Sequence, residues 1–251
     1  MGKLDGRVAL VTGAGQGVGR GIALALAKER ASLALAGRTE SKLLAVAQEI
    51  EALGVPAQTV VVDVKDPESL AAMVDAVVGR FGTIDILVNN AQQSALGTLL
   101  DVPEDSFTDC WNSGPLAIFR LMRLCQPYLR GNGVIINLGS STSVNPLPLG
   151  RGVYAAAKAA ITALTRTAAV EWGVDGIRAI TVMPAVASDA AIAFQQSQPE
   201  AWRRSQEAIP LRRLGDAVTE IGATVAMLCS DDAAYITGTV IAIDGGQAHL
   251  R

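Results

Sequence analysis

Seven short apolar runs recur along the chain, and longer segments with the apolar spacing of helices separate most of them. The runs occupy residues 8–11, 33–36, 59–62, 84–88, 134–138, 178–182 and 240–243. Strands that are apolar along their whole length are typical of a parallel sheet covered on both faces. The sequence therefore predicts an α/β fold, a doubly wound parallel sheet of about seven strands with helices on both faces.

The segments between these runs predict the helices and the domain organisation. Helices are expected over residues 19–30, 41–53, 67–78, 106–129 and 154–172. No linker or repeat interrupts the alternation, so residues 1–251 are predicted to form a single domain. The polar stretch 185–210 follows the sixth run, where an insertion is well placed to cover a ligand crevice. A plain surface helix is the alternative for that stretch.

Composition excludes several classes of protein. Half of the residues are apolar and the formal net charge is −3, without the basic surplus of a nucleic-acid-binding protein. No run approaches the roughly 18 apolar residues of a membrane-spanning helix, so no membrane association is expected. The N-terminus lacks the apolar core of a signal peptide. Three widely spaced cysteines, Cys110, Cys125 and Cys229, fit buried thiols in a reducing compartment, which predicts a cytoplasmic protein.

The first apolar run leads directly into the sequence Thr-Gly-Ala-Gly-Gln-Gly-Val-Gly at residues 12–19, and a helix pattern follows. Glycines in such a turn let the backbone approach a pyrophosphate, and the helix N-terminus offers free N–H groups. A glycine-rich turn between a strand and a helix predicts a Rossmann-type dinucleotide-binding domain. The expected cofactor-binding residues of this turn are Gly13, Gly15, Gln16, Gly17, Val18 and Gly19.

The end of the second run predicts which dinucleotide is bound. A carboxylate at this place would accept a hydrogen bond from a ribose 2′-hydroxyl, whereas an arginine would pair with a 2′-phosphate. The chain has Arg38 there, and a guanidinium suits a phosphate. NADP(H) is therefore the preferred cofactor, and NAD(H) is the alternative because Glu40 lies two residues further along.

Tyr154 and Lys158 are four residues apart in a predicted helix, which puts them on one face. A tyrosine has an ordinary pKa of about 10, and a neighbouring ammonium group favours its phenolate form. Such a pair is suited to acid–base catalysis near neutral pH. An exposed helical pair is the alternative, but the position after the fifth strand of a dinucleotide fold favours the catalytic interpretation.

The order of these and several further motifs resembles the short-chain dehydrogenase/reductase family over essentially the whole chain. The glycine turn is followed by Asp63, an Asn-Asn-Ala sequence at 89–91, Ser140, the Tyr154–Lys158 pair and an Asp-Gly-Gly sequence at 244–246. The resemblance implies an NAD(P)-dependent oxidoreductase that transfers a hydride between the nicotinamide and a carbonyl or alcohol substrate. It also implies a homo-oligomer, either a tetramer or a dimer.

The same resemblance implies a role for each matching residue. Tyr154 is expected to exchange a proton with the substrate oxygen, Lys158 to hold the nicotinamide ribose and lower the tyrosine pKa, and Ser140 to hydrogen-bond the substrate oxygen. Asp63 is expected to contact the adenine. The other expected cofactor-binding residues are Val64, Asn90, Ala91, Pro184 and Val186.

Four features depart from the family pattern. Gln92 stands where a glycine usually follows Asn-Asn-Ala, and its side chain is expected to crowd the loop beside the nicotinamide. The family's helix asparagine, which supports a proton relay, corresponds to Asn112 or is replaced by Trp111, depending on the alignment. Asn112 is thus a further candidate catalytic residue. The interval from Ser140 to the tyrosine is one residue longer than is common, and Ala185 replaces a glycine after the sixth strand.

Other function classes fit the sequence less well. The single histidine, His249, and the lack of a G-x-S-x-G sequence argue against a hydrolase, and no cluster of ligands predicts a metal site. A catalytically weak relative that binds NADP(H) and an NAD-linked alcohol dehydrogenase remain as alternatives. Apolar residues in the expected substrate loops favour a partly apolar ketone or an acyl thioester. These residues are Val144, Leu147, Leu149, Val186 and Ala187.

Overall fold

The computed structural model describes residues 2–145, 150–186 and 197–248. Within these residues, seven parallel strands form one sheet in the order β3-β2-β1-β4-β5-β6-β7, which confirms the predicted architecture. The strands are β1 (Val8–Thr12), β2 (Ser32–Gly37), β3 (Ala57–Val61), β4 (Ile86–Asn89), β5 (Val134–Leu138), β6 (Arg178–Pro184) and β7 (Val240–Ile243). Against the sequence prediction, β3 and β4 begin two residues away from their expected starts.

The strand order reverses between β1 and β4, where Leu10 pairs with Leu87. The chain builds β2 and β3 on one side of β1 and then crosses back to place β4, β5, β6 and β7 on the other side. All residues of β1, β4 and β5 are buried, because helices cover both faces of the sheet. In an open parallel sheet, the carboxyl ends of the strands beside such a reversal form the ligand crevice.

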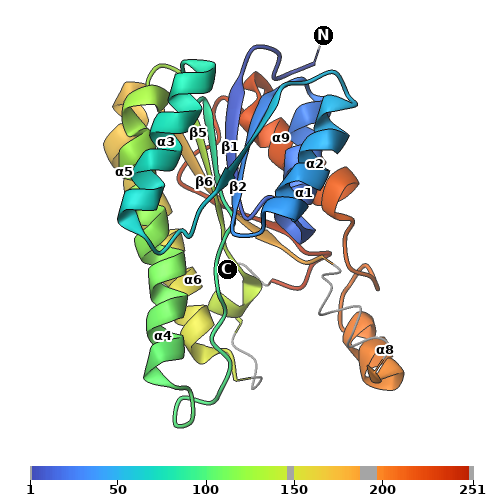
Figure 1. Ribbon diagram of the computed structural model, residues 1–251. Helices are drawn as coiled ribbons and strands as arrows, with labels where there is room; N and C mark the ends of the chain where they lie inside the picture. The colour runs from blue at the N-terminus through green and yellow to red at the C-terminus, as the bar shows by residue number, and fades with distance from the viewer. Residues whose placement is uncertain (1, 146–149, 187–196, 249–251) are drawn as a thin grey trace.

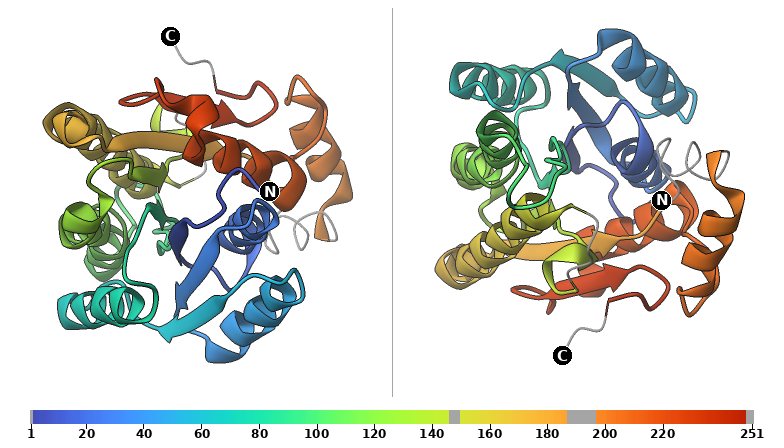
Figure 2. Two further views of the ribbon diagram at one scale, coloured as in Figure 1. Left: turned by 90° about the horizontal axis from the view of Figure 1, so that it is seen from above. Right: turned by 90° about the horizontal axis from the view of Figure 1, so that it is seen from below.

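Helices cover the sheet in two layers (Figure 2). One layer contains α1 (Gly17–Lys28), α2 (Glu40–Glu51) and α9 (Ala223–Cys229). The other contains α3 (Pro67–Phe81), α5 (Ala117–Leu129) and α6 (Gly152–Trp172). Figure 1 shows α4 (Glu104–Trp111) below α5 and shows α8 (Pro199–Glu207) set apart from the sheet. No helix in the described ranges is long and apolar enough to cross a membrane.

The long helix expected over residues 106–129 is interrupted. A π-helical turn, Asn112–Leu116, separates α4 from α5. Pro115 lies inside this turn and has no backbone N–H to donate, so one hydrogen bond of the α-helical ladder is lost there. A wider π turn accommodates that loss, and such turns are frequent at functional sites. The expected helix is thus present over residues 104–129, and the π-helical turn is a local change of geometry within it.

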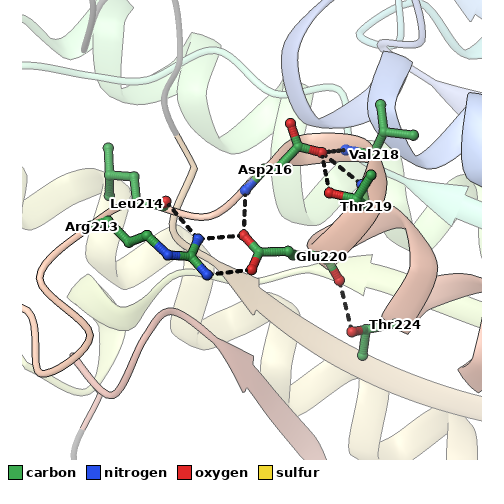
Figure 3. Close-up of polar contacts among 7 residues, drawn as sticks. All are labelled: Arg213, Leu214, Asp216, Val218, Thr219, Glu220 and Thr224. Atoms are coloured by element: carbon green, nitrogen blue, oxygen red, sulfur yellow. Dashed lines mark hydrogen bonds and ion pairs between the residues drawn. The ribbon is translucent and has the colours of Figure 1, made fainter.

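A helical segment over residues 217–229 went unpredicted, and a polar cap starts it (Figure 3). The Asp216 carboxylate accepts hydrogen bonds from the backbone N–H groups of Val218 and Thr219, at 2.9 and 2.7 Å. Glu220 Oε2 accepts from the Asp216 N–H at 2.8 Å, and Arg213 donates to both Glu220 carboxylate oxygens. These contacts satisfy the free donors of the first turn, as in a capping box.

Candidate functional site

The turn from β1 into α1 is locked to the end of β4. The Thr12 hydroxyl accepts hydrogen bonds from the Asn90 and Ala91 N–H groups, at 3.0 and 3.1 Å. The Asn90 amide donates back to the carbonyls of Thr12 and Gly13, at 2.9 and 3.2 Å. Gly19 packs behind the turn, where a Cβ would lie 2.3 Å from the Gly13 oxygen. These hydrogen bonds join the end of β1 to the end of β4, where the strand order reverses, and they hold the turn in place.

A hollow of about 470 Å³ opens over this turn, and we call it the glycine-turn pocket. Of the residues expected to bind a cofactor, those that line it are Gly13, Gly15, Gln16, Gly17, Val18, Arg38, Asp63, Val64, Asn90 and Ala91. Gly17 has a φ of +55°, and a Cβ there would meet nothing within 4 Å, so the backbone leaves open space toward the pocket. The described residues thus form a cradle that fits a dinucleotide backbone.

Two exposed cations flank the glycine-turn pocket. Arg38 follows β2, and Lys42 lies on the first turn of α2. The Lys42 ammonium donates a hydrogen bond to Gln16 Oε1, which ties α2 to the glycine turn. Asp63 Oδ1 accepts from the Lys65 N–H at 3.0 Å, so its carboxylate is oriented by its own loop. A phosphate entering this side of the pocket would meet two positive charges.

Tyr154 and Lys158 lie one turn apart on α6, as their spacing predicts. The Lys158 ammonium donates a 2.5 Å hydrogen bond to the Leu138 carbonyl at the end of β5, and it lies 5.4 Å from the Tyr154 ring centroid. The lysine is only 4% exposed. Burial lowers the pKa of Lys158 to about 7, because a charged ammonium is poorly solvated there.

The pKa of Tyr154 shifts in the direction opposite to the expected one. Burial raises it above its ordinary value, which outweighs the lowering by the Arg151 charge and by the neighbouring Ser140 hydroxyl. Tyr154 is therefore held as a neutral phenol, the form that donates a proton.

Ser140 follows β5 and begins a short 3-10 turn, Ser141–Ser143. Its hydroxyl forms a 2.9 Å hydrogen bond with the Thr142 hydroxyl and accepts from the Thr142 N–H. The structure thus brings Ser140 to the same end of the sheet as Tyr154 and Lys158. The described lining of the glycine-turn pocket does not include these three residues. It also does not include three of the expected cofactor-binding residues, Gly19, Pro184 and Val186.

The two unusual positions before α5 take different places. Asn112 is half-buried at the start of the π-helical turn and does not line the glycine-turn pocket, whereas its neighbour Ser113 does. Gln92 also lines the pocket, and its side chain lies against Gly114 within the π-helical turn. Gln92 thus turns toward the helix, against which its side chain packs.

The segment after β6 is partly described. Ala185 accepts a hydrogen bond from the Gly215 N–H at 3.0 Å, and Val186 pairs with Gly215 in an isolated bridge. These contacts hold Pro184 and Val186 beside the sheet's carboxyl edge. The residues Leu147, Leu149, Ala187 and His249, and the part of the expected crevice cover at 187–196, lie outside the described residues.

A family model described as enoyl-(acyl carrier protein) reductase matches residues 13–248. The chain belongs to the short-chain dehydrogenase/reductase family and is an NAD(P)-dependent oxidoreductase. A 12α-hydroxysteroid dehydrogenase of Clostridium sp. is 39% identical over 256 residues, 98% of each chain.

Solved structures of other members of this family superimpose closely. A 7α-hydroxysteroid dehydrogenase complexed with NADH and 7-oxo glycochenodeoxycholic acid has a TM-score of 0.90 at 30% identity, covering 99% of this chain and 97% of the other. A short-chain dehydrogenase of Burkholderia cenocepacia J2315 in complex with NADP has a TM-score of 0.91 at 31% identity, covering 98% and 99%.

Sequence reasoning missed part of the pocket of this short-chain dehydrogenase/reductase. The additional lining residues are Gly37, Thr39, Lys42, Leu43, Val62, Gln93 and Ser113. Lys42 had a readable signal, because it lies in the first turn of the helix that follows β2 and therefore starts from the same sheet edge as Arg38. Ser113 had none, since only the π-helical turn brings it to the pocket.

Proposed function

We propose that this chain transfers a hydride between NADP(H) and a carbonyl or alcohol substrate, with Tyr154 as the acid–base group. The observation that carries the proposal is the buried Lys158 one turn from Tyr154, beside Ser140 and at the sheet edge that also holds the glycine-turn pocket. Burial, a cation and a hydroxyl around one phenol are the arrangement that proton transfer requires.

The bound nucleotide would supply the hydride, and the chain's own residues would supply position and a proton. The rigid turn with Gly13, Gly15 and Gly17 would hold the pyrophosphate, and Asp63 and Val64 would flank the adenine. Apart from Arg38, the remaining predicted cofactor contacts are those of Gln16, Val18, Gly19, Asn90, Ala91, Tyr154, Lys158, Pro184 and Val186.

Arg38 and Lys42 support a preference for NADP(H). Both side chains are exposed at the pocket, and Gln16 holds the Lys42 ammonium in place. Two cations offer a 2′-phosphate charge-assisted hydrogen bonds, whereas a 2′-hydroxyl gains little from them. NAD(H) use remains the alternative, and it predicts no loss of affinity when the 2′-phosphate is absent.

The raised pKa of Tyr154 keeps the phenol protonated, which is the form that carbonyl reduction requires. Ser140 would donate a hydrogen bond to the carbonyl oxygen, and the neutral phenol would give its proton to that oxygen as the alkoxide develops. The Lys158 ammonium would stabilise the phenolate that is left. Asn112 is a further candidate in this proton transfer, from the start of the π-helical turn.

The substrate class we propose is a partly apolar ketone. Val144 is 48% exposed in the loop after β5, and Leu99 and Leu100 are exposed on the neighbouring loop before α4. Exposed apolar side chains near a site are suited to an apolar ligand. The steroid dehydrogenases that resemble this chain make a ring ketone the first compound to test; an acyl thioester is the alternative.

We also infer a cytoplasmic homo-oligomer, a tetramer or a dimer. Phe107 and Trp111 stack at 6.0 Å on the outer side of α4, and Phe119 is exposed on α5. Clustered exposed aromatic residues favour a protein interface. The three cysteines are free and buried, which suits a reducing compartment.

The decisive experiment combines nucleotide titration with one variant. We expect NADPH to bind at least about tenfold more tightly than NADH, a difference of about 1.4 kcal/mol. Tyr154→Phe should keep NADPH affinity and lose nearly all reduction of ketones. Retained turnover in Tyr154→Phe would refute the assignment of the acid. Binding without turnover of any carbonyl or alcohol by the unaltered protein would instead support a non-catalytic relative.

A further inference from the structure

Three polar side chains in the core form a hydrogen-bonded row from β4 across β5 to α6. The Asn89 amide nitrogen donates to Asn137 Oδ1 at 2.8 Å. The Asn137 amide nitrogen in turn donates to the Thr165 hydroxyl at 2.8 Å. Asn89 is 2% exposed, and Asn137 and Thr165 are fully buried. We call these three residues the polar row, and none of them has a part in the proton transfer proposed above.

The direction of the hydrogen bonds in the polar row is fixed. The Thr165 hydroxyl lies 2.7 Å from the Ile161 carbonyl, which can only accept, so its single hydrogen points to that carbonyl. The hydroxyl oxygen therefore accepts from Asn137, whose amide nitrogen must face α6 and whose oxygen must face Asn89. The polar row is thus one defined arrangement, in which each member orients the next.

The polar row joins the same two elements as the lysine of the proton-transfer pair. Asn137 immediately precedes Leu138, whose carbonyl accepts the 2.5 Å hydrogen bond from Lys158. Thr165 lies seven residues after Lys158, two turns further along α6 and on the same helix face. The helix is therefore held to the end of β5 by two polar contacts, one from Lys158 and one from Thr165.

The other end of the polar row lies beside the nucleotide half of the site. Asn89 precedes Asn90, whose amide donates to the carbonyls of Thr12 and Gly13 in the glycine turn. Asn89 Oδ1 is buried and accepts no hydrogen bond within the described ranges. Apolar residues of the same shape would stabilise such a core equally well or better. The place of the polar row between the two halves of the site therefore indicates a role in geometry.

We propose that Asn137 and Thr165 are positioning residues for Lys158: their hydrogen bond sets the place of α6 on β5 from which the lysine ammonium reaches the last carbonyl of the strand. This inference rests on the proposed function, in which Lys158 acts with Tyr154. A misplacement of about 1 Å in a catalytic site can lower a rate about 100-fold. Neither Asn137 nor Thr165 belongs to the described lining of the glycine-turn pocket, so both act through Lys158.

The first test exchanges the Thr165 hydroxyl for a methyl group. Thr165→Val keeps the shape of the side chain but leaves the Asn137 amide nitrogen with only the Met122 sulfur, at 3.4 Å. We expect kcat for ketone reduction to fall about tenfold. NADPH affinity should change less, because the glycine turn keeps its own contacts with Asn90. Thr165→Ser retains the hydroxyl and should keep most of kcat. An unchanged kcat in Thr165→Val, or an equal loss in Thr165→Ser, would overturn the inference.

Two control variants separate a lost position from a loosened core. Thr181→Val makes the same exchange on β6, beside Asn137 in the sheet, where the Thr181 hydroxyl is buried and has no partner in the described part of the chain. It should leave kcat unchanged. Ile161→Val removes a methylene group from α6 and lowers the melting temperature, but it keeps the polar row and should largely keep kcat. A loss of kcat in Ile161→Val as large as that in Thr165→Val would overturn the inference.

The last measurement needs no turnover. The pKa of Lys158 is followed by NMR in protein labelled with ¹³Cε-lysine, and Lys158→Met assigns the signal. If α6 slides on β5, water reaches the ammonium group. The Lys158 pKa should then rise from about 7 toward 10.5 in Thr165→Val, by about one unit, but not in Thr181→Val. Cys110 and Tyr154, the titratable groups beside the lysine, are the same in every variant.

The NMR titration and the kinetics fail in different ways. An unchanged Lys158 pKa in Thr165→Val would overturn the positioning role, whether or not a ketone is reduced. Absence of turnover by the unaltered protein would refute the proposed function, and the titration would still show whether the polar row holds Lys158 in place.

Discussion

The two halves of the site differ in how far their positively charged side chains are exposed to solvent. In the glycine-turn pocket, Arg38 and Lys42 are exposed at the edge of the sheet. In the proton-transfer region, Lys158 is buried and its pKa falls to about 7. An exposed cation is available to bind an anion, whereas burial lowers the pKa of a cation and makes its charge depend on pH. Binding and proton transfer therefore place opposite demands on burial.

The largest expected effect comes from removing the buried cation. Lys158→Met should lower kcat by about 100-fold or more, the usual range for a component of acid–base catalysis. Lys28→Met, an exposed lysine on α1, is the matched control and should leave kcat unchanged. Steady-state kinetics of ketone reduction gives the measurement. Equal kcat values for the two variants would abolish the distinction between the two regions.

The same variant should change stability in a pH-dependent way. The pKa of Lys158 is about 7 when folded against an ordinary value of 10.5, so between these values the folded protein binds fewer protons than the unfolded chain. Stability of the unaltered protein should therefore rise with pH across that window. Below pH 7, Lys158→Met should have the larger free energy of unfolding, by up to a few kcal/mol, and this advantage should shrink toward pH 10. A constant difference across pH would contradict the burial effect.

The next effect concerns the rigidity of the glycine turn. Gly19→Ala places a Cβ 2.3 Å from the Gly13 oxygen and 2.5 Å from Asn90 Nδ2. It should lower the free energy of unfolding by about 1–3 kcal/mol, as overpacking does, and weaken NADPH binding. Gly79→Ala on α3 meets nothing within 4 Å and should raise stability by about 0.5–1 kcal/mol. Denaturant titration distinguishes the two variants, and a stable Gly19→Ala would show that the turn yields easily.

A smaller effect is expected from the exposed cations. Arg38→Asp should reduce the ratio of NADPH to NADH affinity about tenfold, or about 1.4 kcal/mol, and Lys42→Ala should reduce it less because one phosphate contact remains. Nucleotide fluorescence titration at fixed ionic strength measures both ratios. An unchanged ratio in Arg38→Asp would remove the basis for predicting NADP(H).

The smallest effect supplies a baseline outside both regions. Arg213 and Glu220 form an exposed ion pair, and the Arg213 guanidinium holds the pKa of Glu220 down to about 2. Arg213→Ala should lower the melting temperature less than Gly19→Ala does, since exposed pairs contribute little. A lowered carboxyl pKa stabilises above its ordinary value of 4.5, so the difference should vanish as the pH falls toward 2. A larger difference in melting temperature at acid pH would contradict this prediction, because it would mean that the ion pair does not stabilise the protein through the ionised Glu220 carboxylate.

The nucleotide half was largely predictable because its residues are neighbours in sequence. The apolar runs predicted the strands of the sheet, and the glycines at 13–19 follow β1 directly. The hydrophobic pattern and the residue types of the turn were therefore sufficient to predict the nucleotide site. Arg38 could be placed from its position after β2. The spacing of Tyr154 and Lys158 was likewise readable, because four residues span one helical turn.

The proton-transfer half depends on contacts between distant segments. The sequence alone determined the alternation, the parallel sheet, the glycine turn and the shared face of Tyr154 and Lys158. Only the tertiary structure decided that Pro115 opens a π-helical turn, that Gln92 fills the space beside Gly114, and that burial governs the charge of Lys158. Local patterns determine secondary structure, whereas burial and pKa depend on packing among segments that no local pattern records.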